Sequence, residues 1–371
     1  MDNASDAQEI ISKLSTLTKE VHDTLQGSFF DSLAYTKKIK IEQKLGKGCF
    51  GNISKIFLGE HLKNARPLNS NREYINLATD FLKSPPVSIP KGSVFFLTNN
   101  DIGQHLPQYI DFYNNTHEAL FVIWDWDSQH WIHMSSRLAI SSDFYISAGS
   151  ENTFLLSHFN PNMIGPVFVG AHQWTRRFIT EHIELFLEER LNVPLGPHAF
   201  YDSYARRNRA IVTVSKTYPT VCFRNNDYKL KSDLDNLKEW AQYKSHWIAP
   251  VLAGVPIRVF NALITGGIPI LPSFYKNLPE ISILGNSPLY YETSDLIEPT
   301  MINEAAVAKF DFGGESGLIQ RISNAIENHH IDTHCERIFL SIEDSINRII
   351  NNDKSYECGY LGSCNSRVCI S

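Results

Sequence analysis

Two carboxylates stand two residues apart directly after an apolar run of the chain. Asp125 and Asp127 follow residues 119–124, which predict a buried strand, and His130 comes three residues later. The carboxyl ends of parallel strands open onto a ligand crevice, so these side chains are candidates for substrate binding or acid–base chemistry. Two carboxylates could also share a divalent metal, but no third hard ligand stands nearby, and we expect no metal. Polar residues that merely end a strand would give the same pattern.

Other residues extend this candidate site. Trp126 is suited to stacking on a sugar ring, and His172 follows an apolar run that ends at Gly170. His198 and Asp202 lie in a segment rich in proline and glycine between two halves of the chain, where a base or nucleophile would be useful. A capping or turn role fits either of them equally. We therefore assign catalysis to Asp125, Asp127, Asp202 and His198, and acceptor binding to His130, Trp126 and His172.

Residues 254–272 are the most informative segment and predict a helix, a Gly-Gly turn and a strand. Pro256 suits the first position of a helix, whose free N–H groups and positive dipole end attract anions. Arg258 in the first turn can bind a phosphate or carboxylate with two hydrogen bonds. Gly266 and Gly267 supply the backbone freedom that ends a helix. An ordinary helix–turn–strand unit would use the same residues.

Two further cations are candidates for an anionic ligand. Lys216 follows residues 210–214, which predict a strand, and Arg224 follows the apolar run 221–223. A solvated surface position fits each equally well. The expected anion-binding set is Arg258, Asn261, Gly266, Gly267, Lys216 and Arg224.

Short apolar strands alternate with helices along the chain, which predicts an α/β fold with parallel strands and helices on both faces. We expect strands at 94–97, 119–124, 144–147, 166–170, 210–214, 268–271 and 288–291. We expect helices at 6–26, 105–114, 175–191, 233–243, 258–263, 315–328 and 333–351. The break near residue 200 divides the chain into an N-terminal part, residues 1–204, with a helical leader and a Rossmann-like lobe, and a second Rossmann-like lobe, residues 205–371. The two lobes are expected to face each other across a cleft.

Composition excludes several classes of protein. The 371 residues contain 34 Lys and Arg against 40 Asp and Glu, a net charge of −6 that disfavours general binding to nucleic acid. Apolar residues make up 43% and aromatic residues 12%, which disfavours a disordered chain. Residues 1–9 lack a secretion signal, and the most apolar stretch, 247–272, contains Arg258 and four prolines. We expect a soluble, cytoplasmic protein.

Two patterns, one of cysteines and one of glycines, do not support the functions that they first suggest. The spacing of Cys358, Cys364 and Cys369 does not match a zinc pair, and we expect reduced thiols. The turn 46–51 and the triplet 311–313 resemble kinase motifs, but no HRD-type segment stands between them. A tight turn explains the glycines at 46–51 better.

Segment 254–272 resembles the donor-binding helix and following strand of GT-B glycosyltransferases, particularly the exostosin-like and bacterial surface-polysaccharide branches. These share an Arg, a helix of small residues, and then Gly-Gly or Gly-Cys followed by Ile-Pro-Val or Ile-Pro-Ile. Residues 287–296 resemble the strand and short helix that follow, and the similarity covers residues 205–350. The resemblance implies a nucleotide-activated sugar held mostly by the second lobe and an acceptor held mostly by the first. The Glu-x7-Glu pattern of common retaining enzymes is missing, so the stereochemical outcome stays open.

The resemblance implies a glycosyltransferase that extends a surface polysaccharide or lipopolysaccharide and needs no cofactor. The donor is open between CMP, UDP and GDP sugars. An acidic sugar such as Kdo on CMP also fits, although the His-Pro pair of several CMP-sialic acid enzymes is replaced by Pro197-His198. Peripheral association with the membrane or with other polysaccharide-assembly enzymes is compatible with this role. The alternative is a non-catalytic protein of the same fold that binds nucleotide sugar or glycan.

Overall fold

The computed structural model describes most of the chain between residues 28 and 350. The described residues are 12–13, 28–45, 53, 55–66, 72–128, 130–149, 152–157, 159–224, 231–251 and 254–350. The expected leading helix at 6–26 lies outside them except for residues 12 and 13. The turn 46–51 and the three C-terminal cysteines also lie outside them.

Within the described residues, the first sheet has six parallel strands. Their spatial order is β2 (Glu73–Asn76), β1 (Lys55–Leu58), β3 (Ser93–Thr98), β4 (Ala119–Asp125), β5 (Phe144–Ser147) and β6 (Met163–Ile164). Every residue of β3 and β4 is buried, as is usual for parallel strands covered on both faces. The expected strands at 94–97, 119–124 and 144–147 are confirmed.

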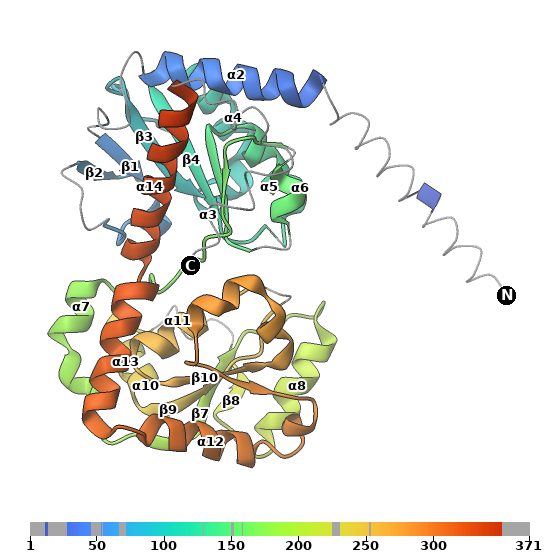
Figure 1. Ribbon diagram of the computed structural model, residues 1–371, viewed down its shortest axis with the longest axis vertical. Coiled ribbons are helices and arrows are strands. Elements are labelled where there is room, and N and C mark those ends of the chain that lie inside the picture. The colour runs from blue at the N-terminus through green and yellow to red at the C-terminus, as the bar shows by residue number, and fades with distance from the viewer. Residues whose placement is uncertain are drawn as a thin grey trace.

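Helices cover both faces of this sheet (Figure 1). Apolar residues of α2 (Ser28–Leu45) and α14 (Ile331–Ile350) pack on one face, together with side chains of β1, β3, β4 and β5. The other face is covered by α4 (Leu106–Asn115), α5 (Ile132–Ile140) and α6 (Thr153–Ser157). The short helix α3 (Asn99–Ile102) follows β3 directly.

The second sheet has five parallel strands in the described part of the chain. Their order is β11 (Leu289–Tyr291), β10 (Ile268–Pro272), β9 (Tyr243–Trp247), β7 (Leu191–His198) and β8 (Val221–Phe223). It has its own apolar core. The helices that accompany it are α7 (Arg176–Glu181), α8 (Ala205–Ser215), α10 (Asp233–Ala241), α11 (Ile257–Ile264), α12 (Thr300–Asp311) and α13 (Gly314–His329).

Both sheets have the same strand order. In each, the strand that comes first in the chain lies between the second and the third, so the direction of winding reverses beside it. Open parallel sheets bind ligands outside the carboxyl ends of the strands at such a switch point. The residues that follow β1 and β3 in the first sheet, and β7 and β9 in the second, are therefore candidates for ligand binding.

Two expectations about secondary structure are wrong. Residues 210–214 form the end of α8, because Ile211 and Val214 are buried while Val212 is 49% exposed, a helical spacing. The helix expected at 175–191 ends at Glu181, and a 3-10 turn over 183–186 follows, which apolar spacing does not distinguish from an α-helix.

The prolines of β7 concealed a strand of the second sheet. Pro194 and Pro197 cannot donate a backbone hydrogen bond and therefore predicted a break rather than a central strand. The sheet accommodates them with a shift of register between Leu191 and Pro194. Residues 166–170, also expected as a strand, run as irregular chain toward the second sheet. The expected elements at 233–243, 258–263, 268–271, 288–291, 315–328 and 333–351 agree within a few residues with α10, α11, β10, β11, α13 and α14, whereas β9 and α12 were not expected.

The chain passes twice between the sheets, and the two passages pair. Ala171 and His330 form a parallel bridge, in which Ala171 N donates to His329 O at 2.8 Å and Ile331 N donates to Ala171 O at 2.9 Å. We call residues 171–174 and 330–332 the crossing. Because β7 pairs in the second sheet and α14 returns to the first, the strands and helices do not divide at residues 204 and 205 as expected.

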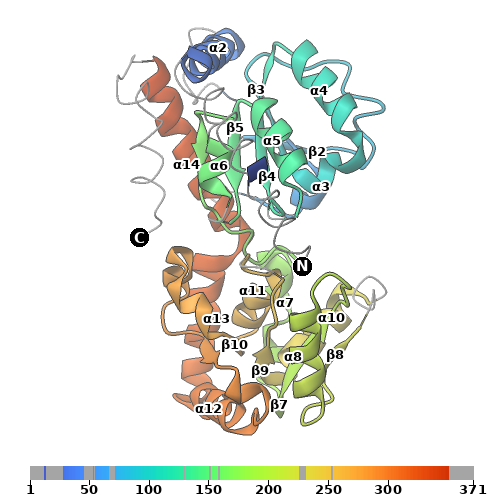
Figure 2. The same cartoon turned by 90° about the vertical axis from the view of Figure 1, so that its right-hand side faces the viewer.

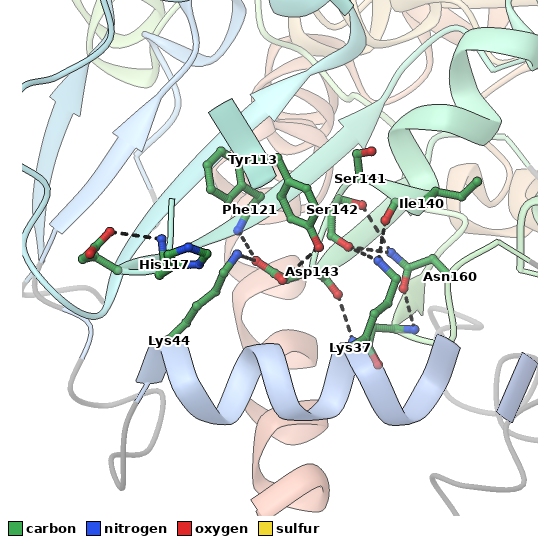
Figure 3. A network of polar contacts seen from close by, with 12 residues as sticks. Lys37, Lys44, Tyr113, His117, Phe121, Ile140, Ser141, Ser142, Asp143 and Asn160 are labelled. Atoms are coloured by element: carbon green, nitrogen blue, oxygen red, sulfur yellow. Dashed lines mark hydrogen bonds and ion pairs between the residues drawn. The ribbon is translucent and has the colours of Figure 1, made fainter. Parts of the chain in front are cut away.

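Two lysines fix α2 to the amino-terminal edge of the first sheet (Figure 3). Lys37 Nζ donates to the carbonyls of Ala139, Ile140 and Ser142, which include the last carbonyls of α5. Lys44 Nζ lies 2.7 Å from Asp143 Oδ2, and both side chains are buried. The same carboxylate oxygen accepts the N–H of Phe121.

No helix among the described residues is long and apolar enough to cross a bilayer.

Candidate functional site

A pocket of about 960 Å³ opens at the carboxyl ends of β1, β7 and β8, next to the switch points of both sheets. Figures 1 and 2 show α3 and α11 at the facing ends of the two bodies. One wall is the turn after β1, and the opposite wall comes from the second sheet, from α10 and from the beginning of α11. The lining residues are Glu60, His61, Lys63, Asn64, His172, Gln173, Pro197, Ala199, Phe200, Tyr201, Arg224, Lys231, Asp233, Asn236, Glu239, Trp240, Ile257, Arg258 and Asn261.

His61 and Asp101 form a hydrogen-bonded pair on the first wall. His61 Nδ1 lies 2.8 Å from Asp101 Oδ1, and the same oxygen accepts the His61 backbone N–H at 3.0 Å. The Asp101 side chain is 2% exposed, whereas that of His61 is 43% exposed and lines the pocket. With Nδ1–H donating to the carboxylate, Nε2 is the nitrogen left to accept a proton from a ligand.

The local sequence holds this pair in place. Asp101 belongs to a capping box, in which its Oδ2 accepts the Thr98 N–H at 2.7 Å while Thr98 Oγ1 accepts the Asp101 N–H. A residue with a Cβ at position 59 would overlap the Asp101 carboxylate, so Gly59 permits the close approach of the two turns. The pair therefore depends on the ends of two neighbouring strands, β1 and β3.

The hydrogen bond that His61 donates to Asp101 is the main reason that the pKa of His61 is raised above its ordinary value, and burial opposes this effect in part. An imidazole that is oriented by a buried carboxylate, with its other nitrogen open to a pocket, is the arrangement of a general base. The charge of Asp101 also stabilises the imidazolium that forms when His61 takes a proton. The pair is thus equipped to deprotonate a hydroxyl group.

The opposite wall is built around the beginning of α11. Pro256 precedes the helix, and Ile257, Arg258 and Asn261 of its first turns line the pocket. Asn261 Nδ2 donates to Gln173 Oε1 at 2.7 Å. The free N–H groups and the positive dipole end of the helix, together with the Arg258 guanidinium, favour an anionic ligand here. The structure thus places Arg258 and Asn261, two of the three pocket-lining residues of the expected anion-binding set, on this helix.

Arg224 also lines this pocket, beside Lys231 and Glu239. Lys231 Nζ lies 2.8 Å from Glu239 Oε2, and Arg224 pairs with the other oxygen of the same carboxylate. Burial raises the pKa of Glu239, but the two cations outweigh burial, so the pKa is lowered and the carboxylate stays ionised. One carboxylate therefore holds two cations at the carboxyl end of β8.

Two of the residues expected to bind an acceptor, Trp126 and His172, lie close to His61. His172 lines the pocket, and its ring centre lies 4.7 Å from that of Trp126, which is 6.1 Å from that of His61. Burial lowers the pKa of His172 to about 4, so this imidazole is neutral at ordinary pH. His130 is exposed, and its Nδ1 lies 3.0 Å from the hydroxyl of Tyr204. Of these residues, Trp126 and His172 lie beside the base.

Asp125 and Asp127 have structural partners and are not among the pocket-lining residues. Asp125 is fully buried, accepts hydrogen bonds from the Tyr145 hydroxyl and the Asp127 N–H, and has a pKa raised mainly by burial. Asp127 accepts from Asn100 Nδ2 at 3.1 Å. Both lie at the end of β4, one strand away from the switch point. Their catalytic assignment stays a prediction.

His198 and Asp202, which were expected to take part in catalysis, are also not among the residues that line the pocket. The His198 ring is buried, with Nδ1 donating to Gly196 O at 2.7 Å and Nε2 accepting the Ala249 N–H at 3.0 Å. Burial, with Arg258 and Arg207 nearby, lowers the pKa of His198 well below its ordinary value. Nδ1 thus bonds within β7, and Nε2 joins β7 to the chain after β9. Asp202 is exposed and is not among the lining residues.

Three expected anion-binding residues lie away from the pocket. Gly266 has a positive φ of 74° at the far end of α11 and packs against Leu318 and Ile322 of α13. Gly267 packs against the His246 ring. Lys216 is exposed at the end of α8, where the chain approaches the amino end of β8. The pocket lies at the other end of β8, its carboxyl end. The strand expected at 210–214, which placed Lys216 at a strand end, is part of α8, and the anion-binding role of Lys216 stays a prediction.

His61 and Asp101 are the residues that sequence reasoning missed. They are 40 positions apart in the chain and meet only because β1 pairs directly with β3. One signal was present, because Thr98 and Asp101 after an apolar run form a capping-box pattern. That pattern predicts a helix start but not the histidine that shares its carboxylate.

Among the described residues, no group of three or more His, Cys, Asp or Glu side chains could hold a metal ion. No protein-family model matches the chain, and no curated protein matches it significantly.

Proposed function

We propose that the protein is a glycosyltransferase of the two-lobed GT-B type, moving a sugar from a nucleotide-activated donor to a glycan acceptor. One observation carries the proposal: His61, which is paired with Asp101, and the beginning of α11 with Arg258 line the same pocket. A base on one wall and an anion site on the other are the two groups that this transfer requires. The matching strand order of the two sheets supports a two-lobed fold with the ligand between the lobes.

In the proposed reaction, the donor phosphate binds at the first turn of α11 and Arg258. Nε2 of His61 takes the proton of an acceptor hydroxyl, whose oxygen forms a bond to the anomeric carbon of the sugar. The bond from that carbon to the phosphate oxygen breaks, and the nucleotide leaves with the electron pair. Asp101 stabilises the imidazolium, and the helix dipole and Arg258 stabilise the charge on the leaving group.

The acceptor is proposed to bind beside Trp126 and His172, whose rings pack together close to His61. Exposed Phe200 and Tyr201 on the opposite wall add further aromatic surface for a sugar. Aromatic faces suit the apolar side of a sugar ring, and the polar rim suits its hydroxyls. We propose a surface polysaccharide or lipopolysaccharide as the acceptor, and a cytoplasmic site of action at the inner face of the membrane.

A nucleotide screen followed by a transfer assay tests this function. The purified full chain is titrated with CMP, UDP and GDP, and a nucleotide that binds raises the melting temperature because it stabilises the native state. Sugar derivatives of that nucleotide are then incubated with the chain and oligosaccharide acceptors. We expect release of the nucleotide that depends on the acceptor and falls at least about a hundredfold in His61→Asn.

The control is His133→Asn, a change in α5 that does not alter a lining residue of the pocket. Binding of a nucleotide sugar without transfer to any acceptor would favour the non-catalytic alternative. Equal activity in His61→Asn and the wild type would overturn the assignment of the base.

A further inference from the structure

The crossing is joined to both helices that begin at the pocket. Trp174 Nε1 donates to the carbonyl of Asp233 at 3.0 Å, in the first turn of α10. Gln173 Oε1 accepts from Asn261 Nδ2 at 2.7 Å, in α11. These two contacts fix one side of the crossing to the wall that carries the proposed anion site.

Asp332 joins the crossing to the other wall. Its Oδ1 accepts the Arg66 backbone N–H at 2.7 Å, and its side chain is nearly buried. Arg66 belongs to the same turn as His61 and is the last described residue of this turn. The turn begins at Gly59, whose N–H donates to Phe96 O at 3.0 Å. Residues 59–66 are therefore held at one end by β3 and at the other by Asp332.

The two sides of the crossing are tied together by His330. Its Nδ1 accepts the Asp332 N–H at 3.2 Å, which leaves the proton on Nε2, and Nε2–H donates to Trp174 O at 2.9 Å. The Asp332 carboxylate also forms an ion pair with Arg176 Nε at 3.4 Å. A continuous series of hydrogen bonds thus runs from the turn of His61 through Asp332, His330 and Trp174 to the start of α10.

We infer that Asp332 is a positioning residue for the proposed base. It does not line the pocket, and it acts by holding the turn 59–66 at a set distance from α10 and α11, so that Nε2 of His61 reaches a hydroxyl beside the bound donor. This inference rests on the proposed function. Asp101 sets the protonation of His61, whereas Asp332 sets its place relative to the second sheet.

Three variants of the full chain test the inference. Asp332→Ala removes the acceptor of the Arg66 N–H. Asp332→Asn keeps an oxygen that can accept that bond but removes the charge. Thr333→Ala, the matched control on the next residue, changes a contact of Arg176 and leaves the Arg66 bond intact.

Two measurements need no substrate, and a third uses the donor found in the nucleotide screen. Hydrogen exchange of the Arg66 amide should be about tenfold to a hundredfold faster in Asp332→Ala, because a bond to a charged acceptor is lost. NMR titration should show an unchanged pKa of His61, because Asp101 is intact. Turnover should fall at least about tenfold with the donor KM within about twofold of the wild type.

Asp332→Asn should recover most of the turnover and most of the protection of the Arg66 amide, and Thr333→Ala should resemble the wild type. Unchanged turnover in Asp332→Ala would overturn the positioning role, as would equal losses in Asp332→Ala and Asp332→Asn. Unchanged exchange at Arg66 would overturn the contact itself. If the wild type transfers no sugar, the proposed function and the positioning role both fail, while exchange still decides whether Asp332 holds the turn.

Discussion

Gly59 and Asp101 approach so closely that a Cβ on residue 59 would overlap the Asp101 carboxylate. The φ of Gly59 is −61°, which any residue can adopt, so the requirement for glycine is one of space alone. The carboxylate occupies that space because it accepts hydrogen bonds from the backbone and side chain of Thr98 and from His61. The position of the His61–Asp101 pair thus depends on a residue that takes no part in its chemistry.

Replacing Gly59 with Ala should therefore impair the pair without unfolding the protein. The added methyl group displaces the carboxylate from His61, and a displacement of about 1 Å can reduce turnover about a hundredfold. We expect the pKa of His61 to fall toward its ordinary value, as measured by NMR titration of the imidazole. If the pKa of His61 stays raised as in the wild type and turnover is unchanged, the turn tolerates the methyl group.

The pH dependence of turnover should report the protonation of His61. A base acts in its neutral form, so turnover should rise as the pH passes upward through the pKa of His61, which Asp101 raises above the ordinary value. Asp101→Asn removes the charge that favours the imidazolium, so the acid limb should move to lower pH and maximal turnover should fall. Rates measured between pH 5 and 9 in the wild type and the variant test this.

Asp111→Asn is the control for charge, because Asp111 is exposed on α4. An acid limb that stays in place in Asp101→Asn would mean that another group titrates. Circular dichroism and melting temperature establish that Asp101→Asn is folded, since Asp101 also caps α3.

Arg258→Ala should weaken binding of the nucleotide donor by about 2 kcal/mol, because a charged hydrogen-bonding partner of the phosphate is lost. Arg209→Ala, an exposed change on α8, is the matched control. Titration calorimetry with the nucleotide from the screen measures both affinities. Unchanged affinity in a folded Arg258→Ala variant would remove Arg258 from the site.

Local sequence predicted the elements with strong and continuous patterns. The buried strands β3, β4 and β5 are uninterrupted apolar runs, and the helix at α11 has both a proline at its start and glycines at its end. The place of Arg258 at the first turn of α11 followed directly. Gly266 and Gly267 were assigned to the same site as Arg258 because they are near it in the sequence, but they lie at the other end of that helix.

What local sequence could not provide is the order of the strands. The His61–Asp101 pair exists because β1 lies beside β3, a pairing between residues that are about 40 positions apart. Asp125 and Asp127 stand at a strand end as expected, but β4 is not at the switch point. The prolines of β7 hid a strand that only its pairing with β8 and β9 reveals.

Asp127→Asn distinguishes the two candidates for the base that takes the proton, the His61 imidazole and the Asp127 carboxylate. Asp127 accepts hydrogen bonds from Asn99 and Asn100 at the end of β4, and an asparagine can keep one of these bonds. If His61 is the base, Asp127→Asn should keep turnover within about threefold of the wild type, whereas a catalytic carboxylate should cost about a hundredfold. A hundredfold loss with unchanged melting temperature and donor affinity would return the catalytic role to Asp127.

The buried Lys37 should make stability depend on pH. Burial lowers the pKa of Lys37 from 10.5 to about 7, against the opposing attraction of Asp143. Between about pH 7 and 10 the unfolded chain therefore binds more protons at this residue than the folded chain, and the free energy of unfolding rises with pH. Below about pH 7 the lysine is protonated in both states, so its contribution becomes constant.

The difference between the wild type and Lys37→Met isolates this effect, because Lys44, His61 and the tyrosines beside α2 titrate in both proteins. Urea unfolding at pH 6.5 and 9.5 should show that the wild type gains on the order of 1 to 4 kcal/mol more than Lys37→Met over this interval. Lys83→Met, an exposed substitution, should change with pH as the wild type does. Parallel curves for the wild type and Lys37→Met would mean that Lys37 keeps its proton in the folded state, held by the three carbonyls around Nζ.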